Sequence, residues 1–314
     1  MMNQEALLSW YRRVQRPLPW RLNPSPWSIL LSEILLQQTQ MERGIVYHQK
    51  LLKRFPTIQS MAESNVDDVL LLWQGAGYYS RARRLHALSI EVMEQYSGTL
   101  PTTYDELLKL PGVGPYTAAA VSSIAFSQPV ACVDGNIRRV MARQTNQENP
   151  TVKDLQTFAD EQLVVEFPGD WNQAMMELGA LVCRPKKPIC DGCPIHDSCL
   201  GIERAHELPL PRRLVKKEVS MECVVCLDDQ GRPELIQRPD SGLFAGLWGP
   251  MYDTKLDTEE FDFLGTIQHQ LSHRTLIVKV WKGSSSKGIN PNEVALSTLD
   301  RRVLNLAGVV LDVP

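Results

Sequence analysis

The spacing of apolar residues predicts a chain that is helical over its first two thirds. From residue 4 to about residue 204, apolar side chains recur every three or four positions, and proline or glycine interrupts the runs. The Ser25-Pro26 pair predicts the start of one such helix. Its expected core stripe consists of Trp27, Leu30, Leu31, Ile34 and Leu35. We therefore expect a mainly α domain over residues 1–204.

The pattern changes after a polar segment. Residues 205–217 contain two prolines and four cations, which predicts an interdomain linker. Beyond it, β-rich stretches predict a smaller α+β domain over residues 218–314. Its expected elements are strands at residues 220–227, 234–237 and 275–281, a turn at residues 228–231 and a closing helix at residues 299–306.

Composition and charge are compatible with a DNA-binding protein without requiring one. Apolar residues make up 43% of the 314 residues and the net charge is −3, but phosphate binding needs only a local basic surface. Four basic clusters could supply it: Arg81, Arg83 and Arg84; Arg138, Arg139 and Arg143; Arg184, Lys186 and Lys187; and Arg212, Arg213, Lys216 and Lys217. No apolar run reaches the roughly 18 residues of a membrane span. We expect a monomeric, cytoplasmic protein.

Residues 110–117 predict a hairpin that holds a phosphate backbone. Gly112 and Gly114 allow a tight turn with exposed backbone N–H groups, and Pro115 suits the first position of the next helix. Thr102 or Thr103 is expected to cap the helix before this turn. Since phosphate is the natural ligand of such a turn, the pattern indicates an enzyme that acts on nucleic acid.

Four cysteines follow a metal-binding pattern. Cys183, Cys190, Cys193 and Cys199 are spaced as C-x6-C-x2-C-x5-C, so one short loop can wrap an iron–sulfur cluster or a structural zinc ion. The spacing alone favours neither. A second pair, Cys223 and Cys226, lies in a predicted strand, where an offset of three residues puts the side chains on opposite faces. We expect that pair, and Cys132, to be small core residues.

Residues 110–117 and 134–143, together with the cysteine loop, resemble the helix-hairpin-helix DNA glycosylases of the endonuclease III superfamily. Within it, the chain is similar to the adenine DNA glycosylase (MutY) family. Further matching stretches are residues 18–21, 32–39, 75–81 and 172–180. The resemblance covers nearly all of residues 5–204. It implies a six-helix lobe at residues 16–135, a second helical lobe from residues 1–15 and 136–204, and a [4Fe–4S] cluster on the four cysteines.

Cleavage of an N-glycosidic bond needs an acid at the departing base and an anion at the sugar. Glu33 is our candidate acid, because Ile29 and Leu36 give it an apolar setting that should raise its pKa. The resemblance implies that it protonates adenine N7. Asp134 is expected to stabilise the oxocarbenium ion, to cap the helix that begins near Asn136, or both.

Three further residues complete the expected catalytic group. The resemblance implies that Tyr116 lies against the sugar cation and that Asn136 orients Asp134 or a water molecule. Glu177 is either a third carboxylate of the site or the partner of a basic side chain. Lyase-competent relatives carry lysine at the position of Tyr116, and a phenol cannot form a Schiff base. We therefore expect base removal without β-lyase activity.

The resemblance also implies residues that contact DNA. Gln38 and Tyr78 match side chains that wedge into the base stack, and Trp20, Arg21 and Leu36 match the adenine pocket. Their alternative role is core packing. A flipped nucleotide is required in any case, because a stacked base cannot reach the catalytic groups.

The C-terminal part resembles the Nudix-like domain that reads 8-oxoguanine in this family. Within residues 268–274, Ser272 and His273 match the lesion-reading positions, while Leu271 stands where the family has phenylalanine. The chain has no Arg-Glu-x-x-Glu-Glu run, so we expect no Nudix phosphohydrolase activity.

The expected function is excision of adenine paired with 8-oxoguanine or guanine in double-stranded DNA, without strand cleavage. One alternative is a pyrimidine-specific glycosylase/lyase of the same fold, which Tyr116 opposes. The other is a non-catalytic DNA-damage sensor, which Glu33 and Asp134 make unnecessary.

Overall fold

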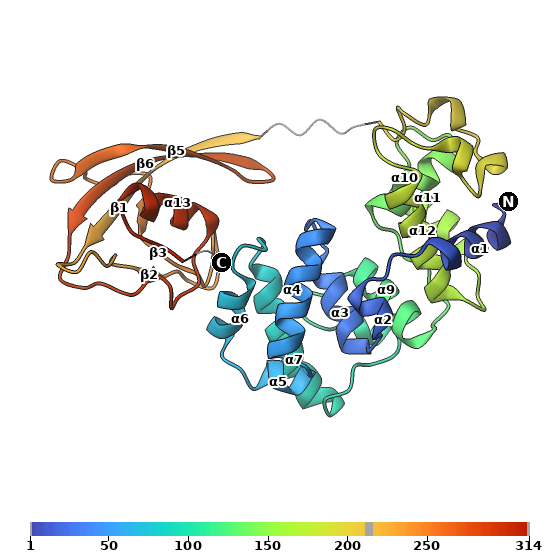
Figure 1. The fold of residues 1–314 in the computed structure, drawn as a ribbon, viewed down its shortest axis with the longest axis horizontal. Coiled ribbons are helices and arrows are strands. Elements are labelled where there is room, and N and C mark those ends of the chain that lie inside the picture. Colours follow the sequence, from blue (N-terminus) through green and yellow to red (C-terminus); the bar gives the residue numbers. More distant parts are fainter. Residues whose placement is uncertain (1, 211–215, 313–314) are drawn as a thin grey trace. The chain divides into compact units, whose positions relative to one another are not determined.

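The computed structural model describes residues 2–210 and 216–312, and it divides into two compact units (Figure 1). The first unit contains Met1–Ala62 and Ala87–Arg212, and the second contains Glu63–His86 and Arg213–Pro314. Helix α7 (Ser80–Tyr96) crosses the boundary between them. In the described part of the chain, no helix combines the length and apolarity that a membrane span needs.

The first unit is built from helices, as the apolar spacing predicts. The bounds are α1 (Gln4–Val14), α2 (Pro19–Leu22), α3 (Pro26–Leu35), α4 (Met41–Arg54), α5 (Ile58–Ala62), α8 (Tyr104–Leu107), α9 (Pro115–Phe126), α10 (Gly135–Gln144), α11 (Val152–Gln162) and α12 (Pro168–Leu181). Three short 3-10 helices follow: η1 (Cys190–Gly192), η2 (His196–Ser198) and η3 (Ile202–Arg204).

Local capping explains several helix starts. Ser25 accepts a hydrogen bond from the Ser28 N–H at the start of α3, whose predicted core stripe is buried. Thr103, one of the two candidates, caps α8 through the Glu106 N–H. Both predictions are confirmed. They depended on side chains close to the caps in sequence, which is why they could be made without tertiary information.

Close helix packing brings the later site residues together. Helices α1, α9, α10 and α12 enclose one core that includes Trp171, Met175 and Leu178. Gly179 allows α12 to approach α10, because a Cβ there would lie 2.5 Å from the Asn136 Cβ. The alanines of α9 are buried in the same way between α3 and α12. Small residues thus set the spacing of the helices that carry the candidate site.

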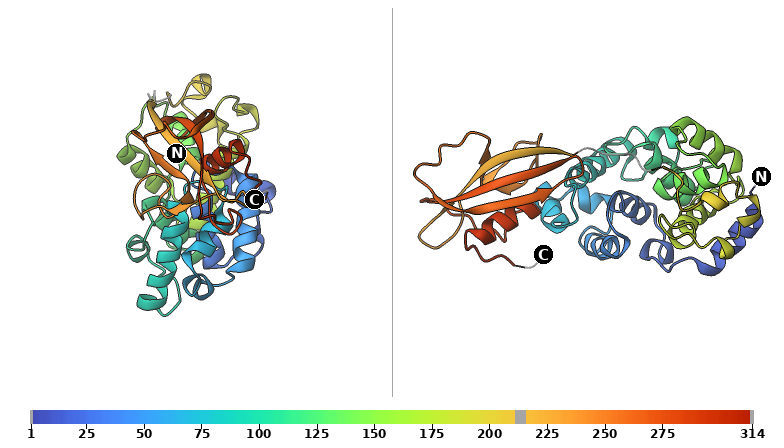
Figure 2. Two further views of the ribbon diagram at one scale, coloured as in Figure 1. Left: turned by 90° about the vertical axis from the view of Figure 1, so that its left-hand side faces the viewer. Right: turned by 90° about the horizontal axis from the view of Figure 1, so that it is seen from above.

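The second unit combines a four-stranded sheet, a two-stranded sheet and helices. Its four-stranded sheet has the order β4-β1-β6-β5, and the bounds are β1 (Lys217–Leu227), β4 (Met251–Asp253), β5 (Asp262–Gln270) and β6 (Arg274–Ser284). Strands β1 and β6 are parallel, while β4 and β5 pair antiparallel with their neighbours. Helix α13 (Thr298–Leu306) packs along the sheet (Figure 2). Helix α6 (Val66–Trp73) also belongs to this unit.

The strand predictions are confirmed in part. Strands β1 and β6 contain the expected strands at residues 220–227 and 275–281, and α13 contains all of the expected helix at residues 299–306. The predicted strand at residues 234–237 is wrong in extent. Only β2 (Ile236–Gln237) is extended, and it pairs with β3 (Trp248–Gly249) in a separate two-stranded sheet. Strand β5 was not predicted, because Gly265 and a register shift interrupt its apolar alternation.

The two compact units differ from the division expected from sequence. Glu63–His86 belongs to the unit of the C-terminal residues, because its side chains form hydrogen bonds with Asp240 and Leu296. At the expected linker, Ala205 and Leu208 are buried in the first unit. Residues 211–215 of that linker lie outside the described residues.

Candidate active site

A cavity of about 1510 Å³ in the first unit collects most of the predicted catalytic and DNA-contacting residues. Helices α2, α3, α9, α10 and α12 contribute to its lining. The predicted residues that line it are Trp20, Arg21, Glu33, Leu36, Gln38, Tyr116, Asp134, Asn136 and Glu177. These side chains come from segments up to 157 residues apart, between Trp20 and Glu177, and the fold brings them around one space that is large enough for a nucleotide.

Glu33 is a buried acid in an apolar setting. It lies on α3, its residue is only 8% exposed, and Ile29 and Leu36 line the cavity beside it. Burial raises the pKa of Glu33 to about 7, although a hydrogen bond from Tyr116 lowers it and the charge of Asp134 raises it further. The predicted upward shift is confirmed. Glu33 can therefore hold a proton close to neutral pH.

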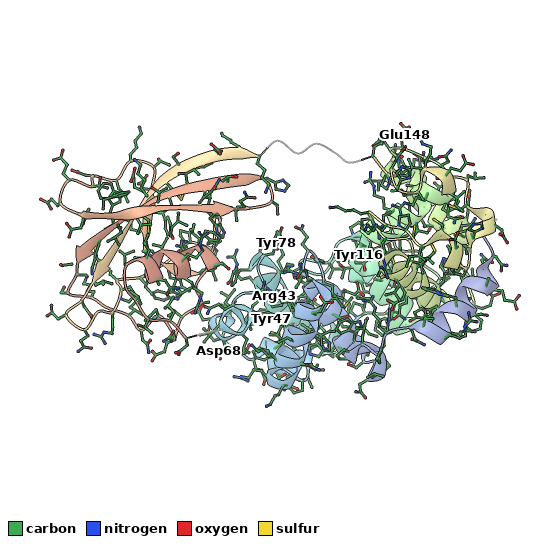
Figure 3. All side chains as sticks on the ribbon, turned by 45° about the horizontal axis from the view of Figure 1, so that its top comes forward. Arg43, Tyr47, Asp68, Tyr78, Tyr116 and Glu148 are labelled. Atoms are coloured by element: carbon green, nitrogen blue, oxygen red, sulfur yellow. The ribbon has the colours of Figure 1, made fainter. Side chains whose placement is uncertain are left out.

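The Tyr116 hydroxyl fixes one oxygen of this acid. Tyr116 projects from the first turn of α9, where Figure 3 labels it, and its hydroxyl donates to Glu33 Oε2 over 2.7 Å. Burial raises the pKa of Tyr116 well above its ordinary value, so the phenol stays a neutral donor. This bond to Oε2 favours the proton of the neutral Glu33 carboxyl on the other oxygen, Oε1, because the carbonyl oxygen of a carboxyl group is its better acceptor.

Asp134 occupies the N-cap of α10. One carboxylate oxygen accepts from the Ile137 N–H over 2.6 Å, and the other accepts from Asn136 Nδ2 over 2.9 Å. Burial raises the pKa of Asp134, and these two hydrogen bonds oppose the rise. Both predicted features, the cap and the orienting bond from Asn136, are present. The carboxylate is held rigidly at the wall of the cavity.

Glu177 is occupied by two arginines. Its carboxylate accepts from Arg16 Nε over 2.7 Å and from Arg21 Nη2 over 3.1 Å, and the Arg16 backbone N–H adds a bond of 3.1 Å. Burial raises the pKa of Glu177, but these hydrogen bonds and charges outweigh it and the net shift is downward. Of the two predicted alternatives, the structure gives the ion pair. We assign Glu177 no step in the chemistry; it positions Arg21 in the cavity wall.

Replacing Glu177 by Gln should lower the free energy of unfolding by about 3 kcal/mol, because it leaves two arginines without their buried counter-charge. Urea denaturation near neutral pH measures this. The matched control is Asp170→Asn on the same helix, whose pair with Arg12 is exposed on both sides and should contribute less than about 1 kcal/mol. Since the pKa of Glu177 is lowered in the folded protein, the contribution of Glu177 to the free energy of unfolding should be lost as pH falls through that pKa. Equal stabilities of the two variants would contradict the assignment.

Arg16 lines the cavity and was not predicted as a site residue. The sequence also did not predict the contacts of Arg139 and Arg143, which are not among the residues that line the cavity. Arg139 donates to Asn136 Oδ1 over 2.8 Å and to the Cys183 carbonyl over 2.8 Å. Arg143 is 1% exposed and donates to the carbonyls of Cys183, Arg184 and Leu208. The sequence placed Arg139 and Arg143 in a basic cluster for DNA, and the structure corrects this: both bind backbone carbonyls inside the first unit.

The helix-hairpin-helix turn has the predicted geometry. Gly112 adopts φ +79°, a left-handed conformation that glycine tolerates best, and Gly114 is the N-cap of α9 with Pro115 in the first turn. Gly112 is exposed and Gly114 partly so. The first N–H groups of α9 have no partner within the helix, which suits an anionic ligand.

The remaining predicted DNA contacts lie in the second unit. Tyr78 stands in the connection between α6 and α7 with φ +50°, and Ser272 and His273 are exposed in the turn between β5 and β6. The Tyr78 hydroxyl forms a hydrogen bond with Ser272 Oγ. A predicted wedge residue and a predicted lesion-reading residue are thus in direct contact.

The four cysteines line one small cavity, together with apolar side chains such as Val140, Leu178 and Val182. Burial raises the pKa of Cys193 to about 11, and the neighbouring cysteines add to the rise. Arg143 Nη1 lies 3.2 Å from Cys183 Sγ. Within the described residues, no three His, Cys, Asp or Glu side chains are arranged around a single metal ion. The four cysteine sulfurs can nevertheless serve as thiolate ligands of a metal ion or an iron–sulfur cluster, and the buried Arg143 guanidinium beside them can offset the negative charge of the thiolates.

Two of the other three cysteines are core residues, as predicted. Cys132 and Cys223 are each no more than 2% exposed and belong to the two hydrophobic cores. The prediction that Cys226 is also a core residue is wrong, because it is partly exposed on the other face of β1. The offset of three residues therefore separates the second pair, as predicted.

Comparisons with known proteins agree with this architecture. Residues 31–163 match the HhH-GPD superfamily of base excision DNA repair proteins. The chain is 34% identical to a rat adenine DNA glycosylase, covering 88% of this chain and 69% of the relative. It is 30% identical to the adenine DNA glycosylase of Buchnera aphidicola subsp. Baizongia pistaciae, covering 88% and 85%. A mouse relative is 35% identical, but the chain spans only 58% of its length.

Solved structures show the same fold. A thermostable thymine-DNA glycosylase superimposes with a TM-score of 0.60 at 29% identity, covering 64% of this chain and 95% of that one. A non-covalent endonuclease III–DNA complex gives a TM-score of 0.57 at 23% identity, covering 64% and 94%. Together with the curated relatives, these similarities show that the chain belongs to the adenine DNA glycosylase family, enzymes of the HhH-GPD base excision repair superfamily.

Proposed function

We propose that this protein removes adenine that is mispaired with 8-oxoguanine or guanine in double-stranded DNA. The observation that carries the proposal is a pair of carboxyl groups, Glu33 and Asp134, in one cavity with different environments. Membership of the adenine DNA glycosylase family supports adenine as the base. Two carboxyl groups with separated roles are what acid-assisted cleavage of an N-glycosidic bond requires.

Glu33 acts as the general acid. Near neutral pH its raised pKa of about 7 leaves a large fraction protonated, and Oε1 is free to deliver that proton. Protonation of adenine N7 withdraws electrons from the glycosidic bond, so the base leaves as a neutral molecule. After departure, the Glu33 carboxylate can position and deprotonate the attacking water.

Asp134 stabilises the positive charge that develops on the sugar. Its carboxylate is held by the Ile137 N–H and by Asn136, so little reorganisation is needed as the charge forms. Tyr116 contributes from the same wall, next to Glu33. Because Tyr116 has no amine, the product is an intact abasic strand.

The nucleotide must leave the duplex before this chemistry. We assign the phosphate backbone to the N–H groups at Gly112 and Gly114. We assign Gln38 of the first unit and Tyr78 of the second unit, each by itself, as side chains that wedge into the base stack. Trp20, Arg21 and Leu36 line the cavity beside Glu33 and form the adenine pocket. Ser272 and His273 read the base opposite, and their exposed position in a turn leaves them accessible to DNA.

The deciding experiment incubates the protein with duplexes that contain one 8-oxoguanine:adenine pair. We expect free adenine and an abasic strand that breaks only after hot alkali. A guanine:adenine duplex should react more slowly, and a thymine-glycol duplex should not react. Borohydride should trap no protein–DNA adduct. Trapping that matches turnover indicates a glycosylase/lyase, and binding without any base release indicates a damage sensor.

We also propose that Cys183, Cys190, Cys193 and Cys199 hold a [4Fe–4S] cluster. When bound, such a cluster supplies redox-active iron and a rigid cross-link within the loop. Protein purified without oxygen should contain iron and sulfide in equal amounts and absorb visible light. Cys193→Ser should lose that absorbance and lower the melting temperature, whereas Cys226→Ser should keep it. A colourless, zinc-containing protein would falsify this assignment.

A further inference from the structure

Glu63–His86 is part of the glycosylase family match, yet it packs in the same unit as the C-terminal residues. It comprises α6, a turn at residues 74–79 and the start of α7. Figure 3 labels Tyr78 within this turn. The turn has a defined shape, because the buried Arg81 donates to the Gly77 carbonyl over 3.1 Å and its guanidinium lies 5.5 Å from the Tyr78 ring.

One anchor joins this turn to Leu296. Gln74 Oε1 accepts from the Leu296 N–H over 2.8 Å, and the Tyr79 hydroxyl donates to the Leu296 carbonyl over 3.0 Å. Leu296 is fully buried, and Gln74 and Tyr79 are each 8% exposed. Both backbone polar groups of Leu296 therefore depend on side chains of the turn, and loss of either side chain leaves a buried group without this partner.

A second anchor joins α7 to the loop at residues 239–246. Arg83 Nη1 donates to the Asp240 carbonyl over 2.8 Å. The Arg83 side chain lies against Gly246, where a Cβ would be 3.2 Å from the Arg83 Cδ. Gly246 has φ +74°, a left-handed backbone conformation that glycine tolerates best. Glycine therefore suits this position both for its backbone and for the close contact with Arg83. The two anchors lie on different segments of the C-terminal part.

Each anchor is connected to the strand that carries the predicted lesion-reading turn. Ser297, next to Leu296, caps α13, and Arg302 of that helix donates to the Gln268 carbonyl of β5 over 2.8 Å. From the second anchor, the Phe244 ring packs on His269 of β5 with a centroid distance of 6.3 Å. Gln268 and His269 precede Ser272, which itself bonds to Tyr78.

We propose that Gln74 and Tyr79 are positioning residues for lesion choice. They hold Leu296, and through α13 and β5 they set the place of Ser272 relative to Tyr78. Discrimination between 8-oxoguanine and guanine opposite adenine depends on this placement, because a hydrogen bond to the lesion requires Ser272 at a fixed distance from the opened base stack. The proposal rests on the proposed function for the substrate, but the anchor itself can be measured without substrate.

The test uses the full-length protein with Gln74→Met and Tyr79→Phe combined. Hydrogen exchange of the Leu296 amide in the DNA-free protein should become about tenfold faster, since both side-chain hydrogen bonds to the Leu296 backbone are lost. In single-turnover assays at saturating protein, preference for 8-oxoguanine:adenine over guanine:adenine should fall about tenfold. The guanine:adenine rate itself should change less than about twofold. Tyr79→Phe alone keeps the ring and should give a smaller loss in the same direction.

The matched control is Tyr96→Phe, which removes a tyrosine hydroxyl from the other end of α7, in the first unit. Tyr96→Phe should leave the exchange rate of the Leu296 amide and the preference for 8-oxoguanine:adenine as they are in the wild type. Unchanged Leu296 exchange in the double variant would overturn the anchor, and faster exchange with unchanged preference would overturn its role in specificity. A wild-type protein that releases adenine from neither duplex rejects the proposed function, and equal rates on both duplexes reject only the specificity role. In either case the exchange data still test the anchor.

Discussion

Asp134→Asn should lower the single-turnover rate of adenine excision by at least a hundredfold while leaving DNA binding nearly unchanged. The carboxylate charge is lost from the cavity wall, and removal of one preorganised electrostatic group from an active site costs at least this much. Asparagine still caps a helix well, so the bond from the Ile137 N–H is retained. Quenched-flow excision from an 8-oxoguanine:adenine duplex measures the rate, and fluorescence anisotropy measures binding.

The cap role and the charge role of Asp134 can be separated. Asp134→Ala removes the charge and the cap together and should destabilise the fold by about 1 kcal/mol more than Asp134→Asn. If the defect came from a frayed α10, only the alanine variant would be slow. A rate for Asp134→Asn close to that of the wild type would remove Asp134 from the mechanism and leave it as a capping residue.

Local features made the chemistry of the site predictable from sequence. Ile29 and Leu36 lie within one turn of Glu33, so the pattern of a single helix already indicates an apolar environment and a raised pKa. Asp134 precedes its helix by one residue, so its cap could also be predicted. Both features concern interactions between near neighbours, which do not depend on how distant segments meet.

Long-range partners could not be predicted in this way. Arg16 and Glu177 are separated by 161 positions, and Gln74 and Leu296 by 222. In the sequence Arg16, Glu177 and Gln74 are ordinary polar residues on a helix or in a loop, and Leu296 is an ordinary apolar residue. The arginines of α10 show the same limit, because a run of cations is normally an exposed face, whereas the Arg143 side chain is buried among carbonyl groups. Such roles depend on burial, and burial depends on the whole fold.

Glu33→Gln should be nearly inactive but more stable than the wild type at alkaline pH. Glutamine has the size of the acid and no proton to donate, so we expect the excision rate to fall by about 10²- to 10⁴-fold. In the wild type the rate should decline as pH rises through about 7, the pKa of Glu33, because the donor form is lost. The residual rate of the variant should show no such decline.

The stability effect follows from the same pKa. In the unfolded chain Glu33 ionises at an ordinary pKa, whereas in the folded protein it stays protonated up to about pH 7. The contribution of Glu33 to stability is therefore fully present below the unfolded pKa and is lost as pH rises to about 7, by about 3 kcal/mol. Urea denaturation at about pH 8.5 should show Glu33→Gln to be more stable than the wild type by a similar amount, and at about pH 4 this advantage should vanish. If the difference in unfolding free energy between Glu33→Gln and the wild type did not change with pH, Glu33 would not be the buried acid of this site. Only a carboxyl group that is costly to ionise in the folded protein serves as an acid near neutral pH and also destabilises the fold when it loses its proton.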